Sequence, residues 1–78
     1  MKHWNRQPHV RATWHRVLID GKSYRRYYYF DHGRAEIKKQ CWDHESPGRF
    51  YMEPPSAFHY HVWFERAEDA VWFRLRWL

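Results

Sequence analysis

The sequence contains few of the residues that define several classes of protein. A single cysteine, Cys41, excludes an internal disulfide framework, so the fold must be held together by packing. No stretch approaches about 18 consecutive apolar residues, and the N-terminal residues lack the apolar run of a signal peptide. We therefore expect no membrane-spanning segment and no secretory leader, and we expect the protein to be cytoplasmic.

The usual signatures of catalysis are also missing. The chain has no glycine-rich phosphate loop, no nucleophile elbow and no pair of carboxylates at a catalytic spacing. Asp31 could serve a metal-dependent nuclease, and clustered His, Arg and Tyr could cleave RNA by acid–base chemistry. A helix cap is the simpler explanation of Asp31. We expect a protein that is not an enzyme and that needs no cofactor.

Basic and aromatic residues are abundant. Fourteen Lys and Arg against nine Asp and Glu give a formal net charge of +5, which suits an anionic partner or plain solubility. Six Trp, six Tyr and five Phe make up 22% of the 78 residues. A chain this short buries only about 60–65% of the surface of its unfolded form. One thin core cannot hide seventeen large rings, so we expect some of them to form a contact surface.

The pattern of apolar residues predicts one α+β domain at residues 10–78, preceded by a flexible arm at residues 1–9. Alternation with period two and β-prone residues predict strands at residues 10–19, 23–30, 49–53 and 58–64. Asp20-Gly21 between the first two runs is a hairpin signal. Helical periodicity predicts helices at residues 34–45 and from about residue 66 to the C-terminus, with a terminal strand as the alternative for the last segment.

The predicted element order is β-β-α-β-β-α. Its β-α-β-β-α part is the ferredoxin-like pattern without the last strand, and the N-terminal hairpin supplies a strand in that position. We predict a circularly permuted ferredoxin-like fold, in which a four-stranded antiparallel sheet carries two helices on one face. The expected order of the strands in the sheet is 10–19, 23–30, 58–64, 49–53.

Such a fold leaves the other face of the sheet bare. The outward positions of its two central strands combine basic and aromatic side chains, namely Arg25, Tyr27, Tyr29, His59, His61 and Trp63. This face can bind a protein, a second copy of the chain included, and we favour that function because the strip at residues 59–63 is nearly neutral. The alternative is single-stranded nucleic acid, because rings stack on bases and the arginines of the N-terminal hairpin suit phosphates.

Residues 56–70 resemble the third strand and second helix of the RNA-recognition-motif domain. In that family alternating aromatics run into a helix that begins with Glu/Asp-Ala, as Val62-Trp63-Phe64-Glu65 and Glu68-Asp69-Ala70 do here. The resemblance implies that the exposed stacking positions fall on His59 and His61, with a tyrosine of the partner strand as a third ring. The Lys/Arg-Gly opening of the family's strand is absent.

The segment Glu68–Trp77, which reads EDAVWFRLRW, is similar to the C-terminal end of small proteins encoded by tailed bacteriophages. Those proteins tend to end in Glu/Asp-Asp-Ala, an apolar pair and then a basic-Leu-basic-aromatic run. The resemblance implies a phage accessory protein in the host cytoplasm, either an inhibitor of a host machine or a virion component. It implies no site residues.

Two further constellations have simpler explanations. Cys41 and His44 lie one helical turn apart, and His59 and His61 share a strand face, so the four residues have the donor types of a zinc site. The predicted fold places the two pairs on opposite sides of the sheet, so we expect no metal site. The C-terminal Trp and Arg residues could lie on a membrane surface, but packing on the sheet explains the same pattern.

Overall fold

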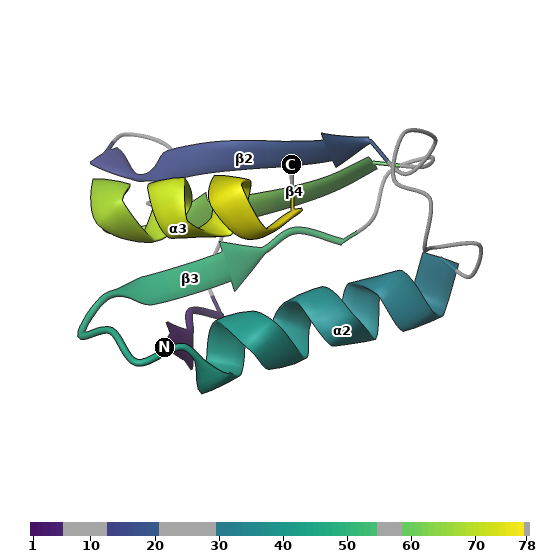
Figure 1. Cartoon of the computed structure of the whole chain (residues 1–78), viewed down its shortest axis with the longest axis horizontal. Coiled ribbons are helices and arrows are strands. Elements are labelled where there is room, and N and C mark those ends of the chain that lie inside the picture. The colour runs from purple at the N-terminus through teal and green to yellow at the C-terminus, as the bar shows by residue number, and fades with distance from the viewer. Residues whose placement is uncertain (6–12, 21–29, 55–58, 78) are drawn as a thin grey trace.

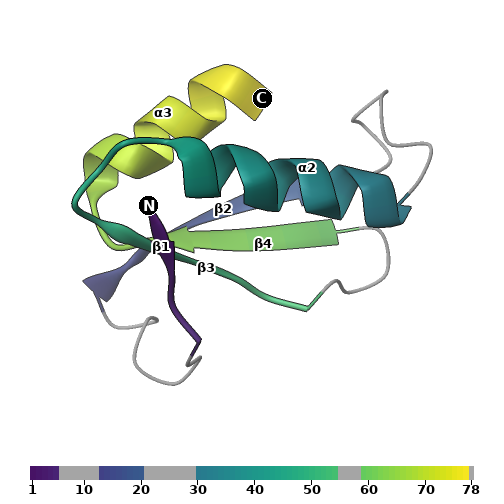
Figure 2. The same ribbon diagram turned by 90° about the horizontal axis from the view of Figure 1, so that it is seen from below.

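The computed structural model of this protein describes residues 1–5, 13–20, 30–54 and 59–77, with the backbone alone for residues 20 and 30–34. In this part of the chain the strands are β1 (Lys2–His3), β2 (His15–Asp20), β3 (Arg49–Met52) and β4 (His59–Phe64), and the helices are α2 (Phe30–Asp43) and α3 (Ala67–Trp77). The strands form one sheet in the order β1-β3-β4-β2, and both helices lie on the same face of it (Figure 1; Figure 2). The predicted α+β class is confirmed.

The sheet is mixed, which corrects the prediction of four antiparallel strands. β4 pairs antiparallel with both β2 and β3, whereas β1 pairs parallel with β3. β2 and β3 are therefore parallel to each other, with β4 between them and α2 in the connection. This arrangement is a split β-α-β unit, to which α3 adds a second helix.

The predicted neighbour of β4 is also corrected. All six residues of β2 pair with β4 in one continuous register, so β2 takes the place that the sequence assigns to residues 23–30. Phe30, the last residue of that predicted strand, is the first residue of α2, and residues 23–29 lie outside the described part of the chain. α2 consequently begins four residues before the predicted helix.

The main core lies between the sheet and the helices, and it explains why β2 pairs with β4. Tyr60, Val62 and Phe64 of β4 are fully buried on the helix side. The register places Val17 opposite Val62 and Ile19 opposite Tyr60, so the two aliphatic side chains of β2 continue the same buried layer. β3, α2 and α3 add further buried side chains to this cluster, namely Phe50, Met52, Ile37, Cys41, Ala70 and Phe73.

The last segment is helical, as predicted. Its buried apolar side chains, Ala70 and Phe73, are three residues apart, whereas Val71 and Leu75 are 52% and 84% exposed. A strand would have put Val71, Phe73 and Leu75 on one face. Acidic residues in the first turn of α3 and basic residues in its last turn also suit the helix dipole.

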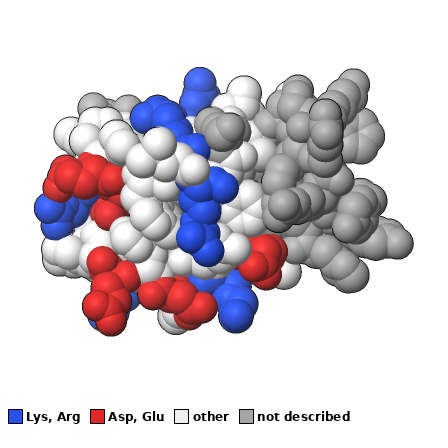
Figure 3. All heavy atoms as spheres, in the orientation of Figure 1, with Lys and Arg blue, Asp and Glu red and all other residues white. Residues whose placement is uncertain are grey.

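The helix side of the molecule carries a band of Lys and Arg side chains (Figure 3). Lys38 and Lys39 of α2 and Arg74 and Arg76 of α3 are exposed. The Arg76 side chain donates a hydrogen bond to the amide oxygen of Gln40, which ties α3 to α2. Part of the positive charge of the chain therefore lies on the face opposite the predicted binding surface.

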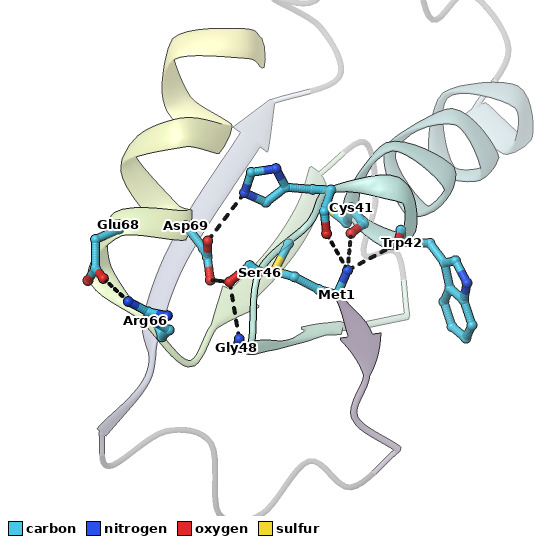
Figure 4. A network of polar contacts seen from close by, with 9 residues as sticks. Met1, Cys41, Trp42, Ser46, Gly48, Arg66, Glu68 and Asp69 are labelled. Carbon is cyan, nitrogen blue, oxygen red and sulfur yellow. Dashed lines mark hydrogen bonds and ion pairs between the residues drawn. The ribbon is translucent and has the colours of Figure 1, made fainter.

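Residues 1–5, which the sequence assigns to a flexible arm, are docked on the edge of the sheet. β1 pairs with β3, and the Met1 side chain belongs to the main core. The α-ammonium of Met1 donates hydrogen bonds to the main-chain oxygens of Cys41 (3.2 Å), Trp42 (3.0 Å) and His44 (2.5 Å), at the C-terminal end of α2 (Figure 4). A cation at this end of a helix also meets the negative pole of its dipole.

Joining an acyl group or a further residue to the Met1 nitrogen should destabilise this fold. The change replaces three charged donors by a single neutral N–H and adds bulk at a buried position. We expect a loss of about 1–3 kcal/mol in the free energy of unfolding, measured by urea denaturation. The same tag placed at the C-terminus is the control, and equal stability of the two tagged chains would contradict the prediction.

Candidate functional site

The face of the sheet opposite the helices, which we term the helix-free face, carries a second and smaller cluster of rings. Tyr51 of β3 and Trp63 of β4 lie opposite each other in the register and are 8% and 7% exposed. Trp4 and Trp14 pack against them, with the centroids of these two rings 6.4 Å apart. The sheet is therefore packed on both faces, and part of the aromatic surplus is used to cover the second one.

Arg49 ties the rim of this cluster together. Its guanidinium carbon lies 4.1 Å from the ring centroid of Trp4 and 5.5 Å from that of Trp14, within the range of a cation–π interaction. The same group pairs with both carboxylate oxygens of Glu65, with Nη2 donating to Oε2 at 2.6 Å and Nε to Oε1 at 3.2 Å. These hydrogen bonds from the Arg49 side chain are the main cause that holds the pKa of Glu65 below its ordinary value of 4.5.

The surface around Trp63 combines an aliphatic side chain with polar groups that contact one another. The indole Nε1–H of Trp63 donates to Oε1 of Glu53 at 2.9 Å, and Oε2 of Glu53 lies 4.0 Å from Nδ1 of His61. The guanidinium of Arg16 lies over the Trp63 ring, 5.7 Å from its centroid. Leu18, opposite His61 in the register, is 46% exposed. The exposed aliphatic side chain of Leu18 therefore lies on the same face as the Glu53 carboxylate, which is hydrogen-bonded to Trp63 and close to His61.

Three of the six predicted site residues lie on this face. His59, His61 and Trp63 alternate along β4 with the residues of the main core, so they are on the side away from the helices. His59 and His61 are half-buried, but Trp63 is covered by the ring cluster and Arg16 and is not presented to solvent. The other three predicted residues, Arg25, Tyr27 and Tyr29, lie outside the described residues.

Sequence reasoning missed the residues that cover Trp63. Trp4 lies in the segment interpreted as an arm, and Trp14 in the run interpreted as a strand. A tryptophan in a polar terminal segment is itself a signal, because so large a ring is on average well buried in folded proteins. The pairing of Arg49 with Glu65 has no comparable local signal, since the two residues are 16 positions apart.

A second polar cluster lies where α2 ends and α3 begins (Figure 4). The carboxylate of Asp69, only 4% exposed, accepts a hydrogen bond from the Ser46 hydroxyl at 2.7 Å and lies 3.3 Å from Nε2 of His44. The His44 ring stacks on Trp72 at 3.8 Å, and the Ser46 oxygen accepts from the Gly48 N–H at 3.1 Å. Asp69 thus stands between Ser46 and His44, whereas a serine nucleophile needs the histidine as its direct partner. The geometry is that of a joint between the helices.

The structure separates the cysteine and histidines that were considered as metal ligands. Cys41 lies in the main core, where burial is the main cause that raises the pKa of its thiol to about 12. His44 contacts Asp69 on the same side of the sheet, while His59 and His61 lie on the helix-free face. Within the described ranges no three His, Cys, Asp or Glu side chains are grouped so as to hold a metal ion.

Comparison with protein-family profiles, with curated proteins and with solved structures finds no match to this chain. Within residues 1–5, 13–20, 30–54 and 59–77, no helix has the length and apolarity needed to cross a bilayer.

Replacing Gly48 by Ala should destabilise the joint between the helices. The added Cβ would lie 2.7 Å from Oδ2 of Asp69 and 3.0 Å from two carbons of the Arg66 side chain. The carboxylate cannot retreat without giving up its hydrogen bond from Ser46. We expect a loss of about 1–3 kcal/mol in the free energy of unfolding. Glu45→Ala, at an exposed neighbour, is the control, with an expected change within about 0.5 kcal/mol. An unchanged Gly48→Ala chain would show that the contact relaxes freely.

The pairing of Arg49 with Glu65 should make stability depend on pH in the acid range. The pKa of Glu65 is lowered in the folded chain, so the pair stabilises the fold above pH 4.5, and this contribution is lost as the pH falls through the folded pKa. We expect the difference in melting temperature between the unmodified chain and Glu65→Gln to shrink between about pH 6 and about pH 3. Glu45→Gln is the matched control. A Glu65→Gln difference that stays constant over this range would refute the assignment.

Proposed function

We propose that this chain is a non-enzymatic interaction protein that binds a protein partner through the helix-free face of its sheet. The observation that carries the proposal is the balance of charge on that face. Arg49 is paired with Glu65, Glu53 accepts a hydrogen bond from Trp63, and Leu18 exposes aliphatic surface beside them. A face on which Arg49, Glu65 and Glu53 have internal partners, beside exposed apolar atoms, suits a protein better than a phosphate backbone.

The burial of the central rings supports the same choice. Stacking on nucleic-acid bases requires an open ring face, and Trp63 and Tyr51 are more than nine-tenths buried. The rings that reach the rim are Trp4 and Trp14, both half-buried. Partly exposed tryptophans around an apolar centre are typical of the residues that dominate protein–protein binding.

Single-stranded nucleic acid is the second candidate, and the distribution of charge along the chain favours it. The residues whose side chains the structure describes include eight of the 14 Lys and Arg and seven of the nine Asp and Glu. Residues 6–12 and 20–34 contain the other six Lys and Arg with two Asp. Phosphate binding through these two segments would weaken steeply with salt.

We further propose that the chain has a ferredoxin-like fold and that a bacteriophage encodes it. The order β2-β4-β3, with α2 and α3 on one face, supports a ferredoxin-like unit whose first strand is β2. A circularly permuted form would also need a strand antiparallel to β2 at its outer edge. The similarity of Glu68–Trp77 to the ends of phage proteins supports a phage accessory protein, either an inhibitor of a host machine or a virion component, in the host cytoplasm.

Leu18→Glu should abolish binding of the partner. The change puts a carboxylate at an exposed position of the helix-free face, on the edge strand β2, and we expect the amount of captured protein to fall at least about tenfold. The measurement is affinity purification of the C-terminally tagged chain from its native host, with and without nuclease treatment. Trp42→Glu, a matched change at a 56% exposed side chain of α2, is the control. Thermal denaturation checks that both variants fold.

The outcomes separate the candidates. Capture that resists nuclease and depends on Leu18 supports a protein partner, as does self-association that light scattering detects and Leu18→Glu removes. Capture that nuclease abolishes, with salt-sensitive binding of a labelled oligonucleotide, supports nucleic acid in its place. Capture that Leu18→Glu and Trp42→Glu affect equally would rule out the helix-free face as the binding surface.

A further inference from the structure

Among the described residues β2 is the last strand on its side of the sheet, and the hydrogen bonds of β4 determine which main-chain groups of β2 point outward. The N–H of Glu53 donates to the carbonyl of His61 at 3.0 Å, so His61 directs its main-chain groups toward β3. Directions alternate along an antiparallel strand, so Val62 faces β2. The register places Val17 opposite Val62 and Leu18 opposite His61. Val17 therefore bonds to β4, while Leu18 directs its N–H and C=O toward the outer edge.

Arg16 also directs its main-chain groups toward this edge, because it lies two residues before Leu18 in the strand. An independent contact agrees with this orientation. Nη2 of Arg74, which reaches over from α3, donates to the carbonyl of Arg16 at 3.4 Å. Together these groups give the edge of β2 an alternating row of peptide donors and acceptors. Such a row complements another extended peptide, whereas a phosphate backbone would meet the carbonyls unfavourably.

Two guanidinium groups flank this edge, one from each side of the sheet. The Arg16 side chain lies on the helix-free face over Trp63, and Arg74 belongs to α3 on the helix side. The ion pairs found between described residues involve neither of them. Exposed apolar surface accompanies both arginines, since Leu18 is on the same face as Arg16 and Val71 precedes Arg74 by one turn of α3.

We infer that the outer edge of β2 is the docking site for an extended, acidic segment of a partner protein, which adds to the sheet as a strand. The main-chain groups of Arg16 and Leu18 hold its backbone, the two guanidiniums attract its carboxylates, and Leu18 and Val71 cover its apolar side chains. The position is the one that the last strand occupies in a β-α-β-β-α-β unit. The inference rests on the proposed function and adds the conformation and charge of the partner.

A synthetic probe tests the site without knowledge of the partner. The probe is an eight-residue peptide with the sequence Val-Val-Glu-Glu-Val-Val-Glu-Glu, acetylated and amidated at its ends, which as a strand presents both Val and Glu on each of its faces. One control has the same sequence with every amide nitrogen methylated, and a second has Lys in place of Glu. Binding is followed by NMR titration of the isotope-labelled chain and by amide hydrogen exchange, which together report affinity and the protection of individual amides.

We expect the Val-Glu peptide to slow exchange at the amides of Arg16 and Leu18. The methylated and Lys peptides should bind at least about tenfold more weakly, because the first cannot donate to the edge and the second repels its arginines. Arg74→Glu should weaken binding of the Val-Glu peptide by a similar factor. Lys38→Glu, the same change of charge at an exposed position of α2, should leave it unchanged.

Several results would overturn the inference. Equal binding of the methylated peptide would show that no strand is added. Slow exchange at Leu18 in the free chain would show that the edge is already occupied, by the chain itself if dilution has no effect and by a second copy if dilution removes it. Native capture that depends on Leu18 but is unaffected by Arg74→Glu and Val71→Glu would retain the proposed function and remove this edge from it. If native capture does not depend on the helix-free face while the probe still binds at the edge, the edge is retained as a docking site and the proposed function is removed.

Discussion

The pairing of β2 with β4 is the constraint on which the rest of the structure depends. Its six-residue register aligns Val17 and Ile19 with Val62 and Tyr60 beneath the helices, and thereby puts Arg16 and Leu18 on the other face. Because side chains alternate with a period of two, a slip of one residue would exchange the two faces of the strand. The buried layer and both candidate surfaces are thus consequences of one register.

A chain of 78 residues without a disulfide has little core to spare, and this one uses both faces of its sheet. The main core lies under the helices, and the rings on the helix-free face form a second cluster closed by the pairing of Arg49 with Glu65. Many of the aromatic rings that suggest an open platform are therefore buried and stabilise the fold. What is left for a partner is the rim of the cluster and the aliphatic surface beside it.

The sequence predicts those parts of the fold that depend on the periodicity of neighbouring residues. The α+β class, the C-terminal helix and the face on which Trp63 lies follow from periodicity. The strand that pairs with β4 could not be predicted in this way. Asp20-Gly21 is a strong local turn signal that favours residues 23–30 as the neighbour, while the pairing of Val17 with Val62 joins residues far apart in the sequence. β1 shows no periodicity that would predict it. Lys2 and His3 are held in the sheet because the neighbouring Met1 is buried and its ammonium binds the C-terminal end of α2. The candidate site is also determined by non-local contacts, because Trp63 is covered by Trp4 and Trp14, which are distant from it in the sequence.

The helix-free face and the edge of β2 meet at Arg16, and this junction limits how a partner can bind. The Arg16 side chain lies over Trp63 on the face, while its main-chain carbonyl belongs to the edge. A strand added at the edge would continue the helix-free face by one strand width, about 4.8 Å, and place its own alternate side chains beside Leu18. The face supplies area without a preferred direction, whereas the edge fixes the direction of the bound backbone. A partner that uses both surfaces must therefore present an acidic strand that places an apolar side chain beside Leu18 and a carboxylate near Arg16.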